Sequence, residues 1–213
     1  MNAIKNRPLV ITDCDEVLLH MVGPFGVWLT EQHGIAFHFI GNDFSQAIRY
    51  VDSNEAVPIK RSWQLLNQFF ETEMHRQTRI DGALSAMQRL GEEADVVVLT
   101  NLGDQFNESR TRQLADLGFN LKVYTNQGPK GPALQKIMAE YAPARAVFID
   151  DIAQHLGSVA ELAPDVFRLH LCGEPRLAPH IPCALTAGQA HARIDTWDQA
   201  LPWLLDTLYE GQP

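Results

Sequence analysis

The feature that most constrains the fold is an alternation of short β-rich runs with helical stretches, which begins near residue 95. The runs are 95–99, 121–124, 146–149 and 166–171, and helical patterns follow at 106–117, at 132–141 and up to about residue 162. Strands that alternate with helices favour a parallel sheet with helices on both faces. A further apolar run, Leu9 to Thr12, is predicted to join the same sheet. The expected fold class is therefore α/β, a doubly wound, Rossmann-like parallel sheet.

The segment from about residue 21 to 76 does not continue this alternation. Its clearest pattern is helical, over 59–74, and places four large apolar side chains on one side: Trp63, Leu66, Phe69 and Phe70. We interpret this stripe as core packing rather than as a cofactor site. The sequence thus predicts an α/β core from 1–20 and 77–213, with a small α-helical insertion at 21–76. Beyond the last predicted core strand we expect a loop at 173–188, a short edge strand at 192–194 and a closing helix at 197–209.

Composition narrows the class of protein. The chain has 213 residues, of which 46% are hydrophobic, enough for one core and a modest second lobe. A formal net charge of -9 disfavours nucleic acid or an anionic membrane as a partner, because both attract basic surfaces. The three cysteines form no CxxC pair, which argues against a zinc ribbon or a disulfide framework. With no signal-peptide pattern and no apolar stretch long enough to span a bilayer, we expect a cytoplasmic protein.

Polar residues follow four of the predicted strands at the point where each strand ends or its connecting helix begins. They are Asp13 and Asp15, Thr100 and Asn101, Lys130, and Asp150 and Asp151. Each has an ordinary alternative explanation, such as a helix cap, a solvated lysine or an acidic helix start. Ligands of open α/β sheets, however, bind at the carboxyl ends of the strands. Because all these residues come at equivalent positions after strands or before helices, they predict a ligand-binding site at that edge of the sheet.

The residue types predict phosphoryl chemistry at this site. Four carboxylates in one cleft require a hard divalent cation, and oxygen ligands with room for water suit Mg²⁺. Thr100, the backbone amides near it and Lys130 would bind an anion. Asp13 could then attack a phosphate monoester while Asp15 protonates the leaving oxygen and later takes a proton from water.

These motifs resemble those of the haloacid dehalogenase (HAD) superfamily of phosphatases. The family's DxD motif after an apolar strand is matched by Asp13-Cys14-Asp15, and its strand ending in Ser or Thr is matched by 96–100. Its lysine at a helix start is best matched by Lys130, with Lys136 the weaker choice, and its acidic pair by Asp150-Asp151. Four motifs occur in the family's order.

The resemblance implies roles for these residues. Asp13 would be the nucleophile and Asp15 the general acid/base, with Thr100, Asn101 and Lys130 binding phosphate. The implied Mg²⁺ ligands are Asp13, the backbone carbonyl of Asp15 and Asp151, with Asp150 as a second ligand or the holder of a metal water. The implied activity is a Mg²⁺-dependent phosphatase that hydrolyses a small phosphorylated metabolite through an aspartyl phosphate.

Two features go beyond the shared motifs. His155 stands where many relatives carry Asn or Asp, and we interpret it as a structural residue at a helix start that can orient a carboxylate. The insertion resembles the cap that selects the substrate in family members. Its candidate selectors, none of which the sequence singles out, are His20, His33, His38, Arg49, Lys60 and Arg61.

Three alternatives stay open at this stage. A phosphomutase or phosphotransferase would use the same residues with a hydroxyl in place of water. A catalytically inactive relative would bind a phosphorylated ligand or a protein partner. A signalling receiver domain also combines acidic residues, Thr and Lys on a doubly wound sheet, but its acidic pair follows the first strand, its lysine comes last and it has no large insertion.

Overall fold

The computed structural model describes residues 7–40 and 44–209, and its core is one parallel sheet. The strands of this sheet are β1 (Leu9–Thr12), β6 (Asp95–Thr100), β7 (Lys122–Thr125), β8 (Ala146–Asp150), β9 (Phe167–His170) and β10 (Ala192–Arg193). They lie in the order β10-β9-β8-β1-β6-β7, and every neighbouring pair is parallel. The predicted α/β class is confirmed, and β1 occupies the middle of the sheet.

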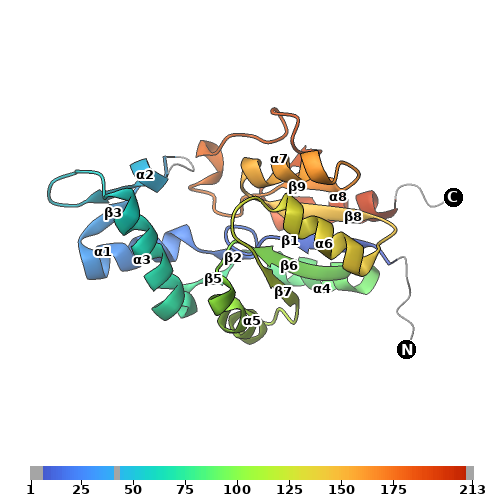
Figure 1. The fold of residues 1–213 in the computed structure, drawn as a ribbon, viewed down its shortest axis with the longest axis horizontal. Helices are drawn as coiled ribbons and strands as arrows, with labels where there is room; N and C mark the ends of the chain where they lie inside the picture. The colour runs from blue at the N-terminus through green and yellow to red at the C-terminus, as the bar shows by residue number, and fades with distance from the viewer. Residues whose placement is uncertain (1–6, 41–43, 210–213) are drawn as a thin grey trace.

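Helices cover both faces of the sheet (Figure 1). They are α4 (Ala83–Glu93), α5 (Asn107–Asp116), α6 (Gly131–Tyr141), α7 (Ala153–Leu162) and α8 (Trp197–Tyr209). Alternate residues of each strand point to opposite faces, so Val10 packs with α4, α5 and α8 while Ile11 packs with α6 and α7. None of the helices described has both the length and the apolar character needed to cross a membrane.

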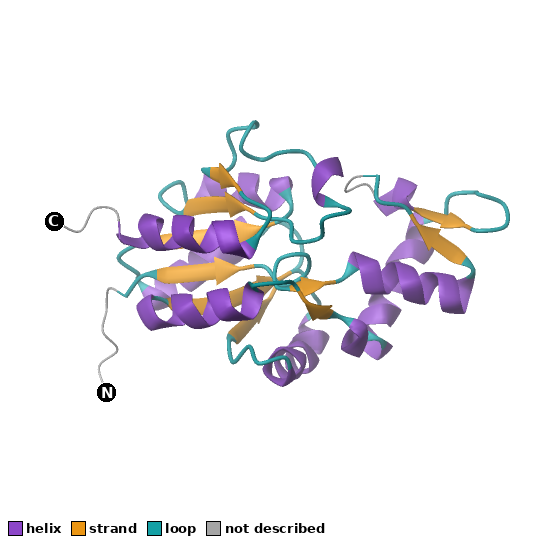
Figure 2. Cartoon of the chain, turned by 180° about the vertical axis from the view of Figure 1, so that it is seen from behind, coloured by secondary structure: helices purple, strands orange, loops and turns teal. Residues whose placement is uncertain are grey.

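A second lobe is inserted after β1. The chain leaves the core through β2 (Leu19–His20) and returns through β5 (Thr78–Arg79), which pair antiparallel. Between them lie α1 (Val22–His33), β3 (Ile35–Phe37), α2 (Phe44–Ala47), β4 (Ile48–Tyr50), α3 (Ile59–Thr72) and a 3-10 turn (Met74–Arg76). Figure 2 shows this segment, here called the cap lobe (residues 21–76), beyond the end of the sheet to which the strands point.

The cap lobe departs from the predicted all-helical insertion in one respect, because β3 and β4 form a two-stranded antiparallel sheet. Strands this short show too little alternation to be distinguished from helical patterns. The interpretation of the α3 stripe as core packing is correct for Phe69 and Phe70, which are buried in the lobe. It is wrong for Trp63, whose exposed fraction is 52%. Helix α3 therefore has a second apolar face that points out of the lobe core.

Candidate active site

Asp13 lies at the centre of the carboxyl edge of the sheet. It directly follows β1, and its backbone N–H donates to the carbonyl of Ile149 at 2.8 Å, which continues the pairing with β8. Because β1 lies between β6 and β8, residues at the ends of all three strands line one cavity together with Asp13, whose carboxylate is nearly buried. The position of this carboxylate follows from the strand order.

Lys130 is fully buried and connects two of the predicted carboxylates. Its Nζ atom lies 2.7 Å from Asp13 Oδ1 and 2.7 Å from Asp150 Oδ2. The start of α6 can bring the lysine this deep because Gly131 packs directly on α7, where a Cβ atom would lie 2.5 Å from the backbone oxygen of Ser158. Lys136, the weaker sequence candidate, is exposed on α6.

The two carboxylates of the acidic pair after β8 lie in different environments. Asp150 is committed to protein donors: Oδ1 accepts from the Ile152 N–H at 2.8 Å and lies 3.2 Å from His155 Nδ1, and Oδ2 contacts Lys130. Asp151 lines the cavity described below. One carboxylate oxygen from each of Asp13, Asp150 and Asp151 lies within 4.8 Å of the others.

The charges of this cluster do not balance. Burial, together with Asp150 and Asp15, raises the pKa of Asp13 to about 6 against the opposing effect of Lys130. Burial and the neighbouring Asp150 raise the pKa of Asp151 well above its ordinary value. At Asp150 burial also acts to raise the pKa, but Lys130 and His155 outweigh it and lower the pKa to about 2. Ionised carboxylates here therefore need more positive charge than Lys130 supplies.

This group of carboxylates offers a site for a divalent cation. An all-oxygen donor set with space on one side suits Mg²⁺, which keeps several waters and uses few carboxylates. Asp13 and Asp151 are the better candidates for direct ligands, because both oxygens of Asp150 already have protein partners. We therefore expect Asp150 to orient Lys130 and His155 rather than to contact the cation.

Polar residues at the ends of β6 and β7, here called the polar rim (Thr100, Asn101 and Asn126), lie beside the cluster. Thr100, at the end of β6, is buried and lines the cavity, and the Asn126 N–H donates to its carbonyl at 3.0 Å. Asn126 Nδ2 donates to Asn101 Oδ1 at 2.8 Å, and Asn101 Nδ2 lies 3.1 Å from His155 Nε2. Because Nε2 accepts from an amide and Nδ1 faces a carboxylate, His155 carries its proton on Nδ1. Sequence reasoning did not identify Asn126, which directly follows β7.

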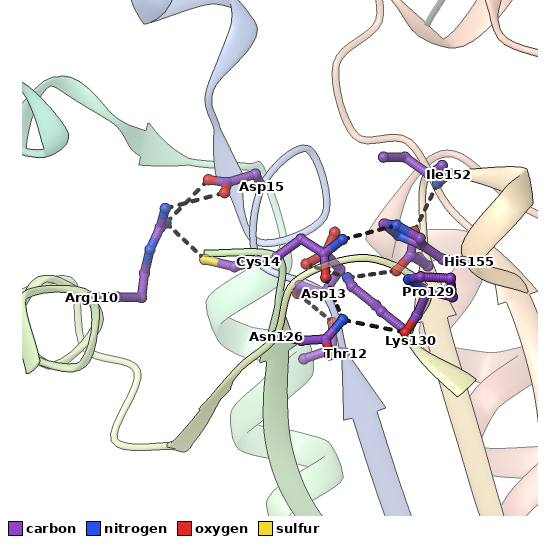
Figure 3. Close-up of polar contacts among 12 residues, drawn as sticks. Thr12, Asp13, Cys14, Asp15, Arg110, Asn126, Pro129, Lys130, Ile152 and His155 are labelled. Carbon is purple, nitrogen blue, oxygen red and sulfur yellow. Dashed lines mark hydrogen bonds and ion pairs between the residues drawn. The ribbon is translucent and has the colours of Figure 1, made fainter. Parts of the chain in front are cut away.

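Asp15 is held apart from this cluster (Figure 3). Its carboxylate forms an ion pair with the buried Arg110, with N···O distances of 3.1 Å to both oxygens, and accepts from Gln77 Nε2 at 2.7 Å. Arg110 Nη1 also donates to Cys14 Sγ at 3.0 Å. Sequence reasoning identified neither Arg110 nor Gln77. The available signal was a charged side chain four residues before Leu114, on the core face of a helix.

A cavity of about 700 Å³ opens from the cluster toward the cap lobe. Its floor includes Asp13, Asp15, Thr100 and Asp151, and side chains of α3 form part of the opposite wall. This volume is typical of a small-molecule site and larger than a phosphate group needs. None of the candidate selectors in the cap lobe lines the cavity.

A second acidic group lies near the point where the chain enters the cap lobe. Glu16, in a left-handed conformation, accepts the N–H groups of Met21 and Val22 at the start of α1. His20 lies 3.4 Å from Glu174, whose carboxylate already forms a two-point ion pair with Arg176. These contacts connect the first turn of the cap lobe to the core.

Comparison with known proteins supports the fold. No protein-family model matches the chain, and no curated protein matches its sequence. Among solved structures, a haloacid dehalogenase-like hydrolase family protein of Streptococcus pneumoniae superposes with a TM-score of 0.64 at 11% identity, covering 95% of this chain and 100% of that one. A HAD family hydrolase of Deinococcus radiodurans, with bound phosphate and sodium, gives 0.64 at 18% identity, covering 96% and 97%. A protein of Bacillus subtilis bound to magnesium gives 0.61 at 13% identity, covering 94% and 100%. The chain therefore has the haloacid dehalogenase-like fold.

Proposed function

We propose that this protein is a Mg²⁺-dependent phosphatase that hydrolyses a small phosphomonoester through an aspartyl phosphate on Asp13. The observation that carries the proposal is the position of Asp13. Its carboxylate lies at the centre of the sheet edge, against the buried Lys130 ammonium and beside Asp151, on the floor of a cavity large enough for a ligand. The phosphate bound by one structural neighbour and the magnesium bound by another are consistent with this chemistry.

In the first half-reaction the Asp13 carboxylate attacks phosphorus, and the bond from phosphorus to the ester oxygen breaks. Lys130 reduces the repulsion between the nucleophile and the phosphate oxygens and holds Asp13 in place. Thr100 and the amides of the rim bind the phosphate oxygens. A bound Mg²⁺, held by Asp13 and Asp151, would supply the additional positive charge that keeps both carboxylates ionised and neutralises the phosphate.

Asp15 completes the proton transfers after a rearrangement. It is ion-paired with Arg110, so its side chain must rotate away from Arg110 and gain a proton before it can donate to the leaving oxygen. In the second half-reaction water attacks phosphorus, its proton passes to Asp15, and the bond between phosphorus and the Asp13 oxygen breaks to release inorganic phosphate. Asp13 is then regenerated as a carboxylate.

The decisive experiment is release of inorganic phosphate from a panel of phosphomonoesters with Mg²⁺, with chelator, and with two variants. We expect release that requires Mg²⁺ and that Asp13→Asn abolishes. Asp116→Asn, an exposed aspartate on α5, is the matched control and should retain full activity. Release that persists in folded Asp13→Asn would contradict an aspartyl phosphate on this residue. Transfer of phosphate to an added alcohol without hydrolysis would favour a phosphotransferase.

A further inference from the structure

We infer that the preferred substrate is a phosphomonoester whose leaving group is apolar and carries no second anionic group. This inference rests on the proposed function, because it takes the Asp13 cluster as the site of the phosphate. Its basis is the different chemistry of the two ends of the cavity.

The end of the cavity away from the cluster is apolar. Helix α3 contributes one continuous stripe, in which Ile59, Trp63, Leu66 and Phe70 recur at helical spacing. Leu177 and Ile181, from the segment after β9, also line the cavity. Asn67 is the one polar residue among those described on the lining face of α3. It supplies a single amide for an uncharged polar atom of a ligand.

Two of these residues are unusually exposed for their size. Ile59 is 48% exposed and Trp63 52%. Both are on the α3 face that lines the cavity, whereas Leu65 and Phe69, on the opposite face, are fully buried in the cap lobe. Ile59 and Trp63 therefore leave about half of their apolar surface open where α3 lines the cavity. Contact with an apolar ligand explains the second face.

The charges of the lining give the second half of the inference. Of the described residues that line the cavity, none is a lysine or an arginine, whereas Asp13, Asp15, Glu16 and Asp151 are acidic. A bound cation, together with Lys130 beside Asp13, would neutralise the phosphate, but a carboxylate or second phosphate on the leaving group would meet apolar walls. Burial of an anion without a partner is strongly unfavourable. Acidic and doubly phosphorylated metabolites should therefore be poor substrates.

The test is a homologous series of n-alkyl phosphates, from ethyl to hexyl, with kcat/KM as the readout. Transfer of one methylene from water to an apolar wall corresponds to a factor of about four, so kcat/KM should rise about fourfold per carbon until the cavity is filled. Replacing the terminal methyl of hexyl phosphate by a carboxylate should lower kcat/KM by at least about tenfold. A flat series, or preference for the carboxylate, would overturn the inference.

A charge variant tests the wall directly. Trp63→Lys places an ammonium at a half-exposed position of the lining and should reverse the preference between the alkyl and the carboxyalkyl phosphate. Val51→Lys adds the same charge at an exposed position of the cap lobe outside the cavity and should leave the preference unchanged. Equal effects of the two variants would contradict a role for the α3 wall.

Failure of the inference can be separated from failure of the proposed function. If the alkyl phosphates are hydrolysed in an Asp13-dependent reaction without any chain-length dependence, the phosphatase proposal holds and the apolar inference fails. If no ester is hydrolysed, the affinity of n-alkyl phosphonates in the presence of Mg²⁺, measured by calorimetry, tests the apolar inference instead. Affinity that rises about fourfold per carbon supports an apolar site on a binding protein, and constant affinity or absence of binding overturns the inference.

Discussion

Replacement of Lys130 by methionine tests the charge arrangement at the floor of the site. The side chain has a similar volume but no ammonium group, so the variant leaves the buried Asp13 and Asp150 carboxylates without their shared cation. At an effective dielectric constant of about 20, each 2.7 Å contact corresponds to about 6 kcal/mol of Coulomb attraction before desolvation is subtracted. Measured losses on breaking buried pairs are about 3 to 5 kcal/mol, and we expect a loss in that range at pH 8.

The loss of unfolding free energy in Lys130→Met should be larger at pH 8 than at pH 5. Asp13 and Asp150 outweigh burial and raise the pKa of Lys130, so the lysine stays protonated from pH 5 to 8 and its own titration adds no pH dependence in this range. In the variant, one proton shared by the two carboxylates can replace the ammonium. Binding of this proton becomes less favourable by about 1.4 kcal/mol for each pH unit above the pKa of aspartate in the unfolded chain. The destabilisation should therefore fall to about 1 kcal/mol near pH 5.

Urea denaturation in the presence of chelator, at pH 5 and pH 8, measures both quantities. Lys136→Met is the matched control on the same helix, because this lysine is exposed and should lose well under 1 kcal/mol at either pH. Lys130→Met should also lower kcat about 100-fold or more, as removal of a charge-stabilising group does in other enzymes. A free energy of unfolding that matches the wild type at pH 8, or an equal loss at both pH values, would refute the charge argument.

Three further predictions concern the surroundings of this cluster. Arg110→Leu should cost about 2 kcal/mol in urea denaturation, below the value for a fully buried pair because Asp15 is partly reached by water, and Arg110→Lys should lose less. Burial raises the pKa of Glu16 to about 8 although two backbone amides donate to it, so the stability of the wild type falls as the pH rises from 4.5 to 8. Glu16→Gln should therefore become more stable relative to the wild type as the pH rises from 5 to 8. A difference in unfolding free energy between variant and wild type that does not change with pH would contradict this. Mg²⁺ at 100 times its dissociation constant should raise the free energy of unfolding by about 2.7 kcal/mol, and Asp151→Asn should remove most of this gain.

The order of elements and the edge at which the polar residues gather could be predicted from the sequence. Apolar runs such as 95–99 mark buried strands, and in a parallel sheet every strand presents its carboxyl end to the same edge. Asp13, Lys130 and Asp150 could therefore be placed at one edge from their positions after strands or before a helix. The structure places them in direct contact.

Other features were decided by tertiary structure alone. The partner of Asp15 is Arg110, 95 residues away on α5, and no local pattern connects them. The helical spacing placed Trp63 and Phe69 on one apolar side of α3, whereas in the structure Phe69 faces the cap lobe core and Trp63 lines the cavity. Periodicity records which side of an element avoids water, because that depends on local geometry. What covers that side depends on how distant elements pack, and only the folded chain determines it.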